Sequence, residues 1–428
     1  MSVARAVLRA GSSRLLTLPV TAAASLVTAR IIIDQTGSSG FAVISTVSTL
    51  AQVLPFADLG VGAGVVNALA ARSASDRVKW GTIASAVRIA IASALAIVVI
   101  ALSVTLFGSW GTILGLQEYQ SPDLDLIVAV ALAFFAASVP LGIGQRVLVG
   151  LSRNAQAVLL SGLTPLLTLA LTVSVVALSP GNWLLLAICP SAALACTSAV
   201  MAASAVRRTK FKPRWIFDAD FRAGGLLRQG MYFTVITLTA SLMLPLGRII
   251  IARSGDLHAV ADFSLIMQLY LPATSVVSAA AIALWPHFAA DRSAGLATRK
   301  KSLIPVAWFG GVGVAGGSAV VLLGPVVATV VSGGAVEPPT AAWLSAGVLL
   351  VVQSLQFAIG MNLTTEDGLR FQALWSIPMS ACAVSLTLLL VSDHLSAAPF
   401  AASAICLAVF LVAPGIIRIV RSWGPEIT

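Results

Sequence analysis

Long apolar stretches separated by short polar segments dominate this chain, and they determine the elements it predicts. A helix needs about 20 apolar residues to cross a bilayer. Twelve stretches near that length cover residues 14–33, 40–69, 81–107, 124–149, 155–178, 183–205, 229–252, 260–285, 302–330, 340–362, 370–391 and 396–417. The pattern predicts an all-α integral membrane protein with about twelve transmembrane helices.

Composition supports a membrane protein, because hydrophobic residues make up 58% of the chain and charged residues only 10%. A soluble domain carries about 25% charged residues. The net charge of +10 would suit a nucleic-acid-binding protein, but the basic residues lie in short loops between apolar stretches. We therefore expect membrane lipids, and no nucleic acid, as partners.

The basic residues also predict orientation and domain organisation. Of the 26 lysines and arginines, one side of the predicted membrane keeps only Arg30, Arg248 and Arg253. The positive-inside rule then places both termini in the cytoplasm. The predicted domains are an N-terminal six-helix lobe at 1–206, a basic cytoplasmic linker at 207–228 and a C-terminal six-helix lobe at 229–428. Six helices per lobe give both lobes one orientation, a parallel 6+6 repeat.

Two segments of the chain echo each other at an offset of 218 positions. Arg30 precedes three isoleucines and a glycine at 37, and Arg248 precedes three isoleucines and a glycine at 255. The following spans echo too, because Ser48 and Gln52 precede a Leu-Pro pair, and so do Ser264 and Gln268. Internal repeats with the binding site at their interface are typical of secondary transporters.

The echoed arginines, Arg30 and Arg248, are the first candidate site residues. Arginine within a span is costly and usually faces a cavity, and its planar fork suits phosphate oxygens. The alternative is that each side chain snorkels to the outer headgroups. Arg88 and Arg146 are further arginines inside predicted spans, and they can snorkel inward in the same way.

Serine, threonine and glutamine side chains form polar stripes on the equivalent spans. At 100° per residue, Thr234, Thr237, Ser241 and Arg248 share one face, whereas Arg30 projects away from the stripe of its own span. Such stripes are often only contacts between helices. Their recurrence in four equivalent spans instead indicates a polar cavity between the halves. The candidate substrate-binding residues are Arg30, Arg248, Gln52, Gln268, Ser48, Ser264, Thr234, Thr237 and Ser241.

Asp58 is the one carboxylate that the sequence places deep in an early span. It could carry a coupling proton or cation, or it could pair with a nearby arginine or cap a helix break. The four cysteines lie in apolar stretches without a CxxC pair, and the three histidines are scattered. No metal centre, cofactor or catalytic residue is therefore expected.

At this point the sequence resembles a known group, the bacterial polysaccharide-repeat flippases of the multidrug/oligosaccharidyl-lipid/polysaccharide exporter superfamily. The resemblance rests on residues 11–13 and 29–33, on Gly40-Phe41, and above all on the segment from Phe56 through Asp58 to Gly64. Residues 247–248 and 261–264 are similar to the opening of the family's second half. The twelve spans in a 6+6 arrangement extend the resemblance over the whole chain.

The resemblance implies a V-shaped pair of lobes whose first two spans line a central cavity. It implies transfer of a polyprenyl-pyrophosphate-linked oligosaccharide across the bacterial cytoplasmic membrane by alternating access. Arg30 and Arg248 would hold the pyrophosphate. Polysaccharide polymerase or ligase machinery would be a further partner.

Other functions stay open at this stage. A multidrug or cation antiporter of the same superfamily would need acidic cavity residues, and a peptidoglycan-precursor flippase is a further member of the superfamily. A membrane-embedded glycan ligase or polymerase needs acid/base or anion-binding groups in a sizeable outer loop. The longest outer segment, 108–123, contains no basic residue, so an enzyme is not expected.

Overall fold

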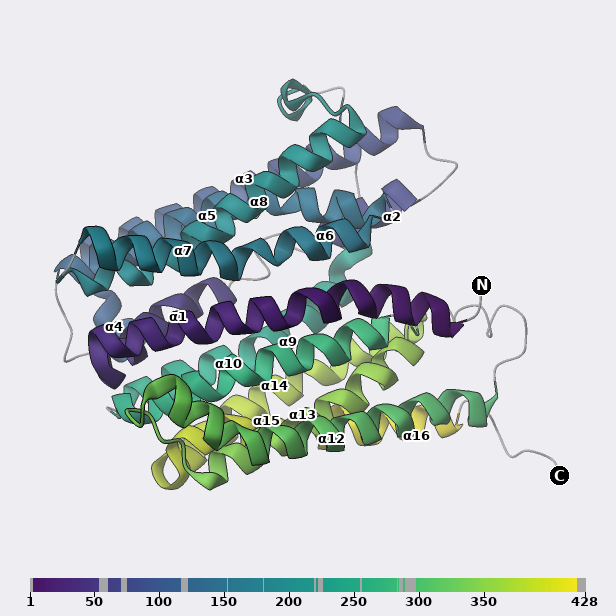
Figure 1. Cartoon of the computed structure of the whole chain (residues 1–428). Coiled ribbons are helices and arrows are strands. Elements are labelled where there is room, and N and C mark those ends of the chain that lie inside the picture. Colours follow the sequence, from purple (N-terminus) through teal and green to yellow (C-terminus); the bar gives the residue numbers. More distant parts are fainter. Residues whose placement is uncertain are drawn as a thin grey trace. The chain divides into compact units, whose positions relative to one another are not determined.

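The computed structural model describes residues 3–53, 61–70, 75–116, 122–151, 153–179, 181–218, 221, 226–254, 256–282, 284, 288 and 298–421. Within those ranges, every regular element is a helix (Figure 1). The first half contains α1 (Val3–Val53), α2 (Val61–Ala70), α3 (Asp76–Phe107), α4 (Trp110–Leu114), α5 (Pro122–Gly150), α6 (Asn154–Ser161), α7 (Leu163–Leu178), the 3-10 helix η3 (Trp183–Ala187), α8 (Cys189–Thr209) and the 3-10 helix η4 (Pro213–Ile216).

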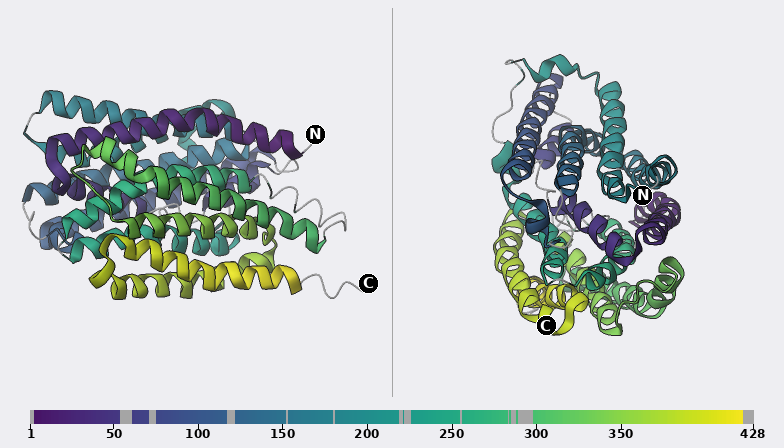
Figure 2. Two further views of the ribbon diagram at one scale, coloured as in Figure 1. Left: turned by 60° about the horizontal axis from the view of Figure 1, so that its bottom comes forward. Right: turned by 90° about the vertical axis from the view of Figure 1, so that its left-hand side faces the viewer.

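The second half is built in the same way from long helices. It contains α9 (Leu226–Arg253), α10 (Leu257–Ile282), α12 (Arg299–Ser332), α13 (Thr340–Asn362), α14 (Glu366–His394), the 3-10 helix η5 (Leu395–Ala397), α15 (Ala398–Leu407), the π-helical turn η6 (Ala408–Val412) and α16 (Ala413–Arg421). Figure 2 shows these helices lengthwise and, after rotation, close to end-on.

Ten of the twelve predicted spans are confirmed as helices that are long and apolar enough to cross a membrane. They run over 76–107, 123–150, 156–178, 183–209, 235–253, 257–278, 299–332, 340–362, 367–392 and 395–421. The other two predictions, 14–33 and 40–69, fall on α1 and α2. Within α1, Gly37 has a φ of +68° and breaks the helical backbone between these two stretches, because a residue with positive φ cannot continue a right-handed helix.

Side-chain caps fix the beginnings of three long helices. The hydroxyls of Ser75, Thr298 and Thr365 accept hydrogen bonds from backbone amides three residues further on, at the first turns of α3, α12 and α14. Such caps satisfy amide groups that have no partner inside the helix. The caps therefore explain why these helices begin where the apolar patterns alone would leave the start ambiguous.

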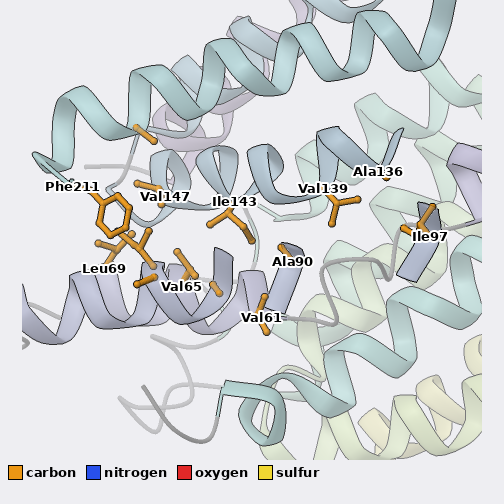
Figure 3. Close-up of a cluster of buried hydrophobic side chains, with 14 of the residues drawn as sticks. Val61, Val65, Leu69, Ala90, Ile97, Ala136, Val139, Ile143, Val147 and Phe211 are labelled. Carbon is orange, nitrogen blue, oxygen red and sulfur yellow. The ribbon is translucent and has the colours of Figure 1, made fainter. Parts of the chain in front are cut away.

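The chain forms two compact units whose boundaries lie inside helices. The N-terminal unit is Ala23–Ser241, and the C-terminal unit combines Met1–Ala22 with Leu242–Thr428. Figure 3 shows the core of the N-terminal unit, where side chains of α2, α3 and α5 interlock. Phe211, from the segment after α8, is part of the same core. The basic segment between the halves thus contributes to the packing of this unit.

Glycines line the extensive contact between α12 and α13 in the C-terminal unit (Figure 1). A Cβ atom added at Gly317 would lie 2.6 Å from the carbonyl oxygen of Gly347. Small residues at such crossings let helix backbones approach and maximise van der Waals contact. Trp343 fills the space over Gly324 further along the same interface, so this helix pair forms a tightly packed part of the unit.

Candidate substrate-binding site

Arg248 is the candidate site residue that the structure buries most deeply among charged side chains. It lies in the last turns of α9, and only 6% of its surface is exposed. Its guanidinium carbon lies 5.7 Å from the centroid of the Phe263 ring on α10. A guanidinium at this distance from an aromatic face is attracted by the ring quadrupole. The arginine is thus positioned inside the protein, and it does not snorkel to a headgroup.

Aromatic packing behind Arg248 holds this arrangement in place. The rings of Phe263 and Phe400 lie 4.7 Å apart between centroids, and Tyr270 lies 6.0 Å from Phe400. A Cβ atom at Gly247 would lie 2.4 Å from Pro399 at the start of α15. Glycine beside the arginine therefore allows α9 to approach α15 closely.

Two further predicted site residues lie on α10 next to Phe263. Ser264 is 1% exposed, and its hydroxyl finds no hydrogen-bond partner among the described residues. Gln268 lies one turn further along and is half-buried. A buried hydroxyl without a partner costs free energy, so a polar ligand that reached Ser264 would gain a hydrogen bond.

Arg30, the repeat-related arginine, has different surroundings. Its Nε donates to the Asp34 carboxylate at 2.7 Å, and the two side chains are 43% and 47% exposed. Asp34 lies one turn later on the same helix and offsets much of the arginine's charge. Arg30 belongs to the N-terminal unit and Arg248 to the C-terminal unit, so their joint contact with one substrate remains a prediction.

The predicted hydroxyl stripes are mostly hydrogen-bonded within their own helices. The hydroxyl of Ser48 donates to the carbonyl oxygen of Ile44 at 2.9 Å, and that of Thr28 donates to Ala24 at 2.8 Å. Such bonds satisfy a hydroxyl inside an apolar helix and leave it able only to accept from a ligand. Thr237 is exposed although Arg248 is buried. The predicted polar face of α9 is therefore exposed at one end and buried at the other.

Four predicted site residues cannot be located in this way. The side chains of Gln52, Thr234 and Ser241 and the whole of Asp58 lie outside the described residues. Their predicted roles, including ion coupling at Asp58, remain predictions.

Sequence reasoning missed the aromatic support of Arg248 and the role of Arg88. The cluster of Phe263, Tyr270 and Phe400 joins residues that lie more than a hundred positions apart, which no local pattern reveals. Arg88 does not snorkel, because its guanidinium donates to the backbone carbonyls of Trp215, Ile216, Asp218 and Phe221. A basic residue at the inner end of a span was the only signal available from the sequence.

A family model described as "Polysaccharide biosynthesis protein" matches residues 11–290 of the chain. A comparison of the sequence with curated proteins finds no match.

Solved structures share the fold over nearly the whole chain. The inward-facing conformation of a multidrug resistance MATE family transporter of the MOP superfamily has a TM-score of 0.68 at 15% identity, covering 97% of this chain and 99% of the other. A variant of the Vibrio cholerae MATE transporter VcmN has a TM-score of 0.65 at 15% identity, covering 99% of this chain and 98% of the other. A MOP superfamily transporter from Pyrococcus furiosus has a TM-score of 0.60 at 16% identity, covering 98% of this chain and 96% of the other.

The TM-scores over nearly the whole chain establish the fold, and the family model establishes the relationship in sequence. The matched region contains both echoed arginines as well as the α9–α10 pair that surrounds Arg248. The protein has the helical fold of MOP superfamily transporters and belongs to the polysaccharide biosynthesis protein family.

Proposed function

We propose that this protein is a flippase that moves a polyprenyl-pyrophosphate-linked oligosaccharide across the bacterial cytoplasmic membrane by alternating access, for cell-surface polysaccharide biosynthesis. The observation that carries the proposal is the buried guanidinium of Arg248 within a chain of the polysaccharide biosynthesis family. Polysaccharide polymerase or ligase machinery would act on the glycan after transfer.

The sign of the buried charge favours an anionic substrate. Among the side chains that the structure describes, Arg248 is the only charged one that is buried. A transporter of cationic drugs would require a buried carboxylate, because a buried cation repels a second cation strongly at low dielectric. The Pyrococcus furiosus transporter with this fold is described as having a binding pocket of reverse polarity that suggests a different function. This description supports the idea that the fold accommodates pockets of different charge.

The geometry of arginine suits a pyrophosphate in particular. Its planar fork can donate two parallel hydrogen bonds to phosphate oxygens, and those bonds are stronger away from water. Packing against Phe263 limits the freedom of the guanidinium before binding, so less side-chain entropy is lost on binding. For transport, the substrate or a coupling ion must bind differently in the inward- and outward-open states.

The test measures lipid-linked oligosaccharide in a bacterial strain from which the gene has been deleted. We expect intermediates that face the cytoplasm to accumulate, wild type to clear them, and Arg248→Ala to fail at normal membrane levels. Arg248→Lys should clear them only partly, because an ammonium lacks the fork. Arg253→Ala is the matched control, since Arg253 is an exposed arginine on the same helix. Arg30→Ala tests the second predicted contact.

The same experiment distinguishes the flippase from the main alternative, a drug or cation antiporter. If no lipid intermediate accumulates and sensitivity to cationic drugs rises instead, the flippase proposal fails and a multidrug or cation antiporter becomes the better account. If intermediates accumulate but Arg248→Ala clears them as well as wild type does, the transported class stands and the pyrophosphate contact at Arg248 is wrong.

A further inference from the structure

The basic segment after α8 folds back onto the N-terminal unit. Lys210 ends α8 in the left-handed region, with a φ of 52°, and reverses the direction of the chain. Phe211 then enters the core shown in Figure 3, and η4 follows directly. The reversal and the buried phenylalanine bring η4 back against the side of its own unit.

Arg88 of α3 fixes the position of η4. Its guanidinium donates to the carbonyl oxygens of Asp218 and Phe221 at 2.7 Å each, and also to those of Trp215 and Ile216. A cation near the last carbonyls of a helical turn is favourable, because those groups carry partial negative charge. One side chain therefore forms hydrogen bonds with the backbone carbonyl oxygens of a whole turn.

Indole rings strengthen the same attachment. Trp80 and Trp215 have ring centroids 4.6 Å apart, and Trp215 stacks on Phe221 at 4.8 Å. The indole nitrogen of Trp80 also donates to the carbonyl oxygen of Thr209 at 3.2 Å. The segment is thus held by both polar and aromatic contacts, which distinguishes it from a solvated linker.

The apolar pattern of α3 gives the depth of this attachment in the membrane. Residues 89–107 contain no charged side chain and span about 28 Å at 1.5 Å per residue, close to the hydrocarbon thickness of a bilayer. Leu95, Val99 and Leu106 are exposed along this run, as expected of lipid-facing residues. Residues 76–88 then extend beyond the hydrocarbon, and Arg88 marks the boundary. The turn bound to Arg88 lies at the level of the headgroups.

The side of this segment that faces away from the unit combines an exposed aromatic ring with cations. Phe217 is 87% exposed even though it follows η4 directly. Arg207, Arg208, Lys210, Lys212 and Arg214 are all exposed as well. Lys212 keeps its ammonium 5.9 Å from the Trp215 ring, so the aromatic cluster positions part of this charge.

We propose that residues 207–217 form an interfacial foot that binds the anionic phospholipid headgroups of the cytoplasmic leaflet. The cations contact phosphate oxygens, and Phe217 enters the boundary between headgroups and acyl chains. Aromatic residues favour that depth, and basic segments next to a span are attracted to anionic lipid. The choice of leaflet rests on the orientation predicted from the lysine and arginine distribution. The foot does not depend on which molecule is transported.

The first arm of the test measures depth in full-length protein reconstituted in nanodiscs. A nitroxide is attached at Phe217→Cys in a variant whose four native cysteines are alanine, and collision rates with oxygen and a nickel chelate are measured. Val78→Cys and Val99→Cys are matched references on α3, because both side chains are exposed but one lies beyond the apolar run and one within it. We expect position 217 to report the headgroup–acyl boundary, between these references. A value equal to that at Val78 overturns the proposal.

The second arm measures enrichment of phosphatidylglycerol over phosphatidylcholine around the protein, by mass spectrometry of co-purified lipids. Lys212→Gln combined with Arg214→Gln should lower this enrichment roughly tenfold, given the attraction of each cation near an anionic surface. Arg299→Gln combined with Lys300→Gln removes two exposed cations at the start of α12 and should leave most of the phosphatidylglycerol enrichment in place. Equal losses in both double variants would show general charge attraction, which also overturns a defined foot.

Discussion

Gly317→Ala tests a close helix crossing in the C-terminal unit, between α12 and α13. The added methyl group would lie 2.6 Å from the carbonyl oxygen of Gly347 and 3.4 Å from a methyl group of Val351. The first neighbour is backbone, so a side-chain rotation cannot relieve the overlap. The α12 and α13 helices would have to separate, and the contacts on both sides of the crossing would weaken.

The size of the effect follows from two opposing contributions. Alanine favours a helix over glycine by up to about 1 kcal/mol, whereas overpacking a close interface costs about 1–3 kcal/mol. Gly311→Ala on the same helix provides the control, because a Cβ there meets nothing within 4 Å. Both variants gain the same helix propensity, so the difference between them isolates the steric cost of about 1–3 kcal/mol.

The assay is thermal unfolding of the detergent-solubilised protein, followed as loss of the monodisperse peak in size-exclusion chromatography. At about 2–4 °C per kcal/mol for domains of this size, Gly317→Ala should lose its peak several degrees below Gly311→Ala. If the two variants unfold at the same temperature, the backbones do not cross as closely as described, and the glycines are not required there.

Two further substitutions test individual polar groups. Arg88→Lys keeps the charge but loses the fork that reaches four carbonyls. We expect at least tenfold faster tryptic cleavage at Arg214 in membranes with the basic side accessible, whereas Arg146→Lys, at an exposed arginine, should match wild type. Equal rates in all three proteins would contradict the attachment of η4 by Arg88. Ser264→Ala removes a buried hydroxyl without a partner among the described residues and should raise the free energy of unfolding by about 1 kcal/mol. Ser354→Ala, which loses a 2.6 Å hydrogen bond to the carbonyl oxygen of Leu350, should lower it by about as much. A loss of stability in the denaturation curves of both variants would mean that Ser264 has a hydrogen-bonding partner.

The sequence predicted the spans well because apolar length is a local property of the chain. Ten spans were confirmed, and the break at Gly37 agrees with the boundary predicted between the first two. The attachment of η4 was not predicted, because Arg88 and the carbonyl of Ile216 lie 128 positions apart. A charged residue near a span end looks the same in sequence whether it binds headgroups, a substrate or a distant backbone turn.

The sequence proposed candidate site residues but could not describe their surroundings. The repeat drew attention to Arg248, and helical periodicity placed Thr237 on the same face. Periodicity describes one helix alone, so it could not show that Phe263 and Phe400 cover the region of Arg248 while Thr237 stays exposed. Nor could it show that hydroxyls such as that of Ser48 donate to carbonyls of their own helix.

The difference between the two echoed arginines leads to a final prediction. Asp34 follows Arg30 by four residues and forms an ion pair with it, but the residue at the corresponding position after Arg248 is Ala252. Ala252 is 1% exposed, so an aspartate there would be a buried carboxylate within one turn of the guanidinium. It would compete with a bound anion for the positive charge of Arg248. If Arg248 binds pyrophosphate, Ala252→Asp should abolish clearance of lipid-linked oligosaccharide.

The control for that change is Ala252→Asn, which adds the same volume without charge. We expect Asn to retain much more clearance than Asp at equal membrane levels, because only the carboxylate neutralises the arginine. Equal loss in both variants would mean that volume at this buried position, and not charge, limits function. In that case the pair of variants would give no support to an anion at Arg248, and Asp34→Ala, which removes the ion pair of Arg30, would be the next variant to assay for clearance.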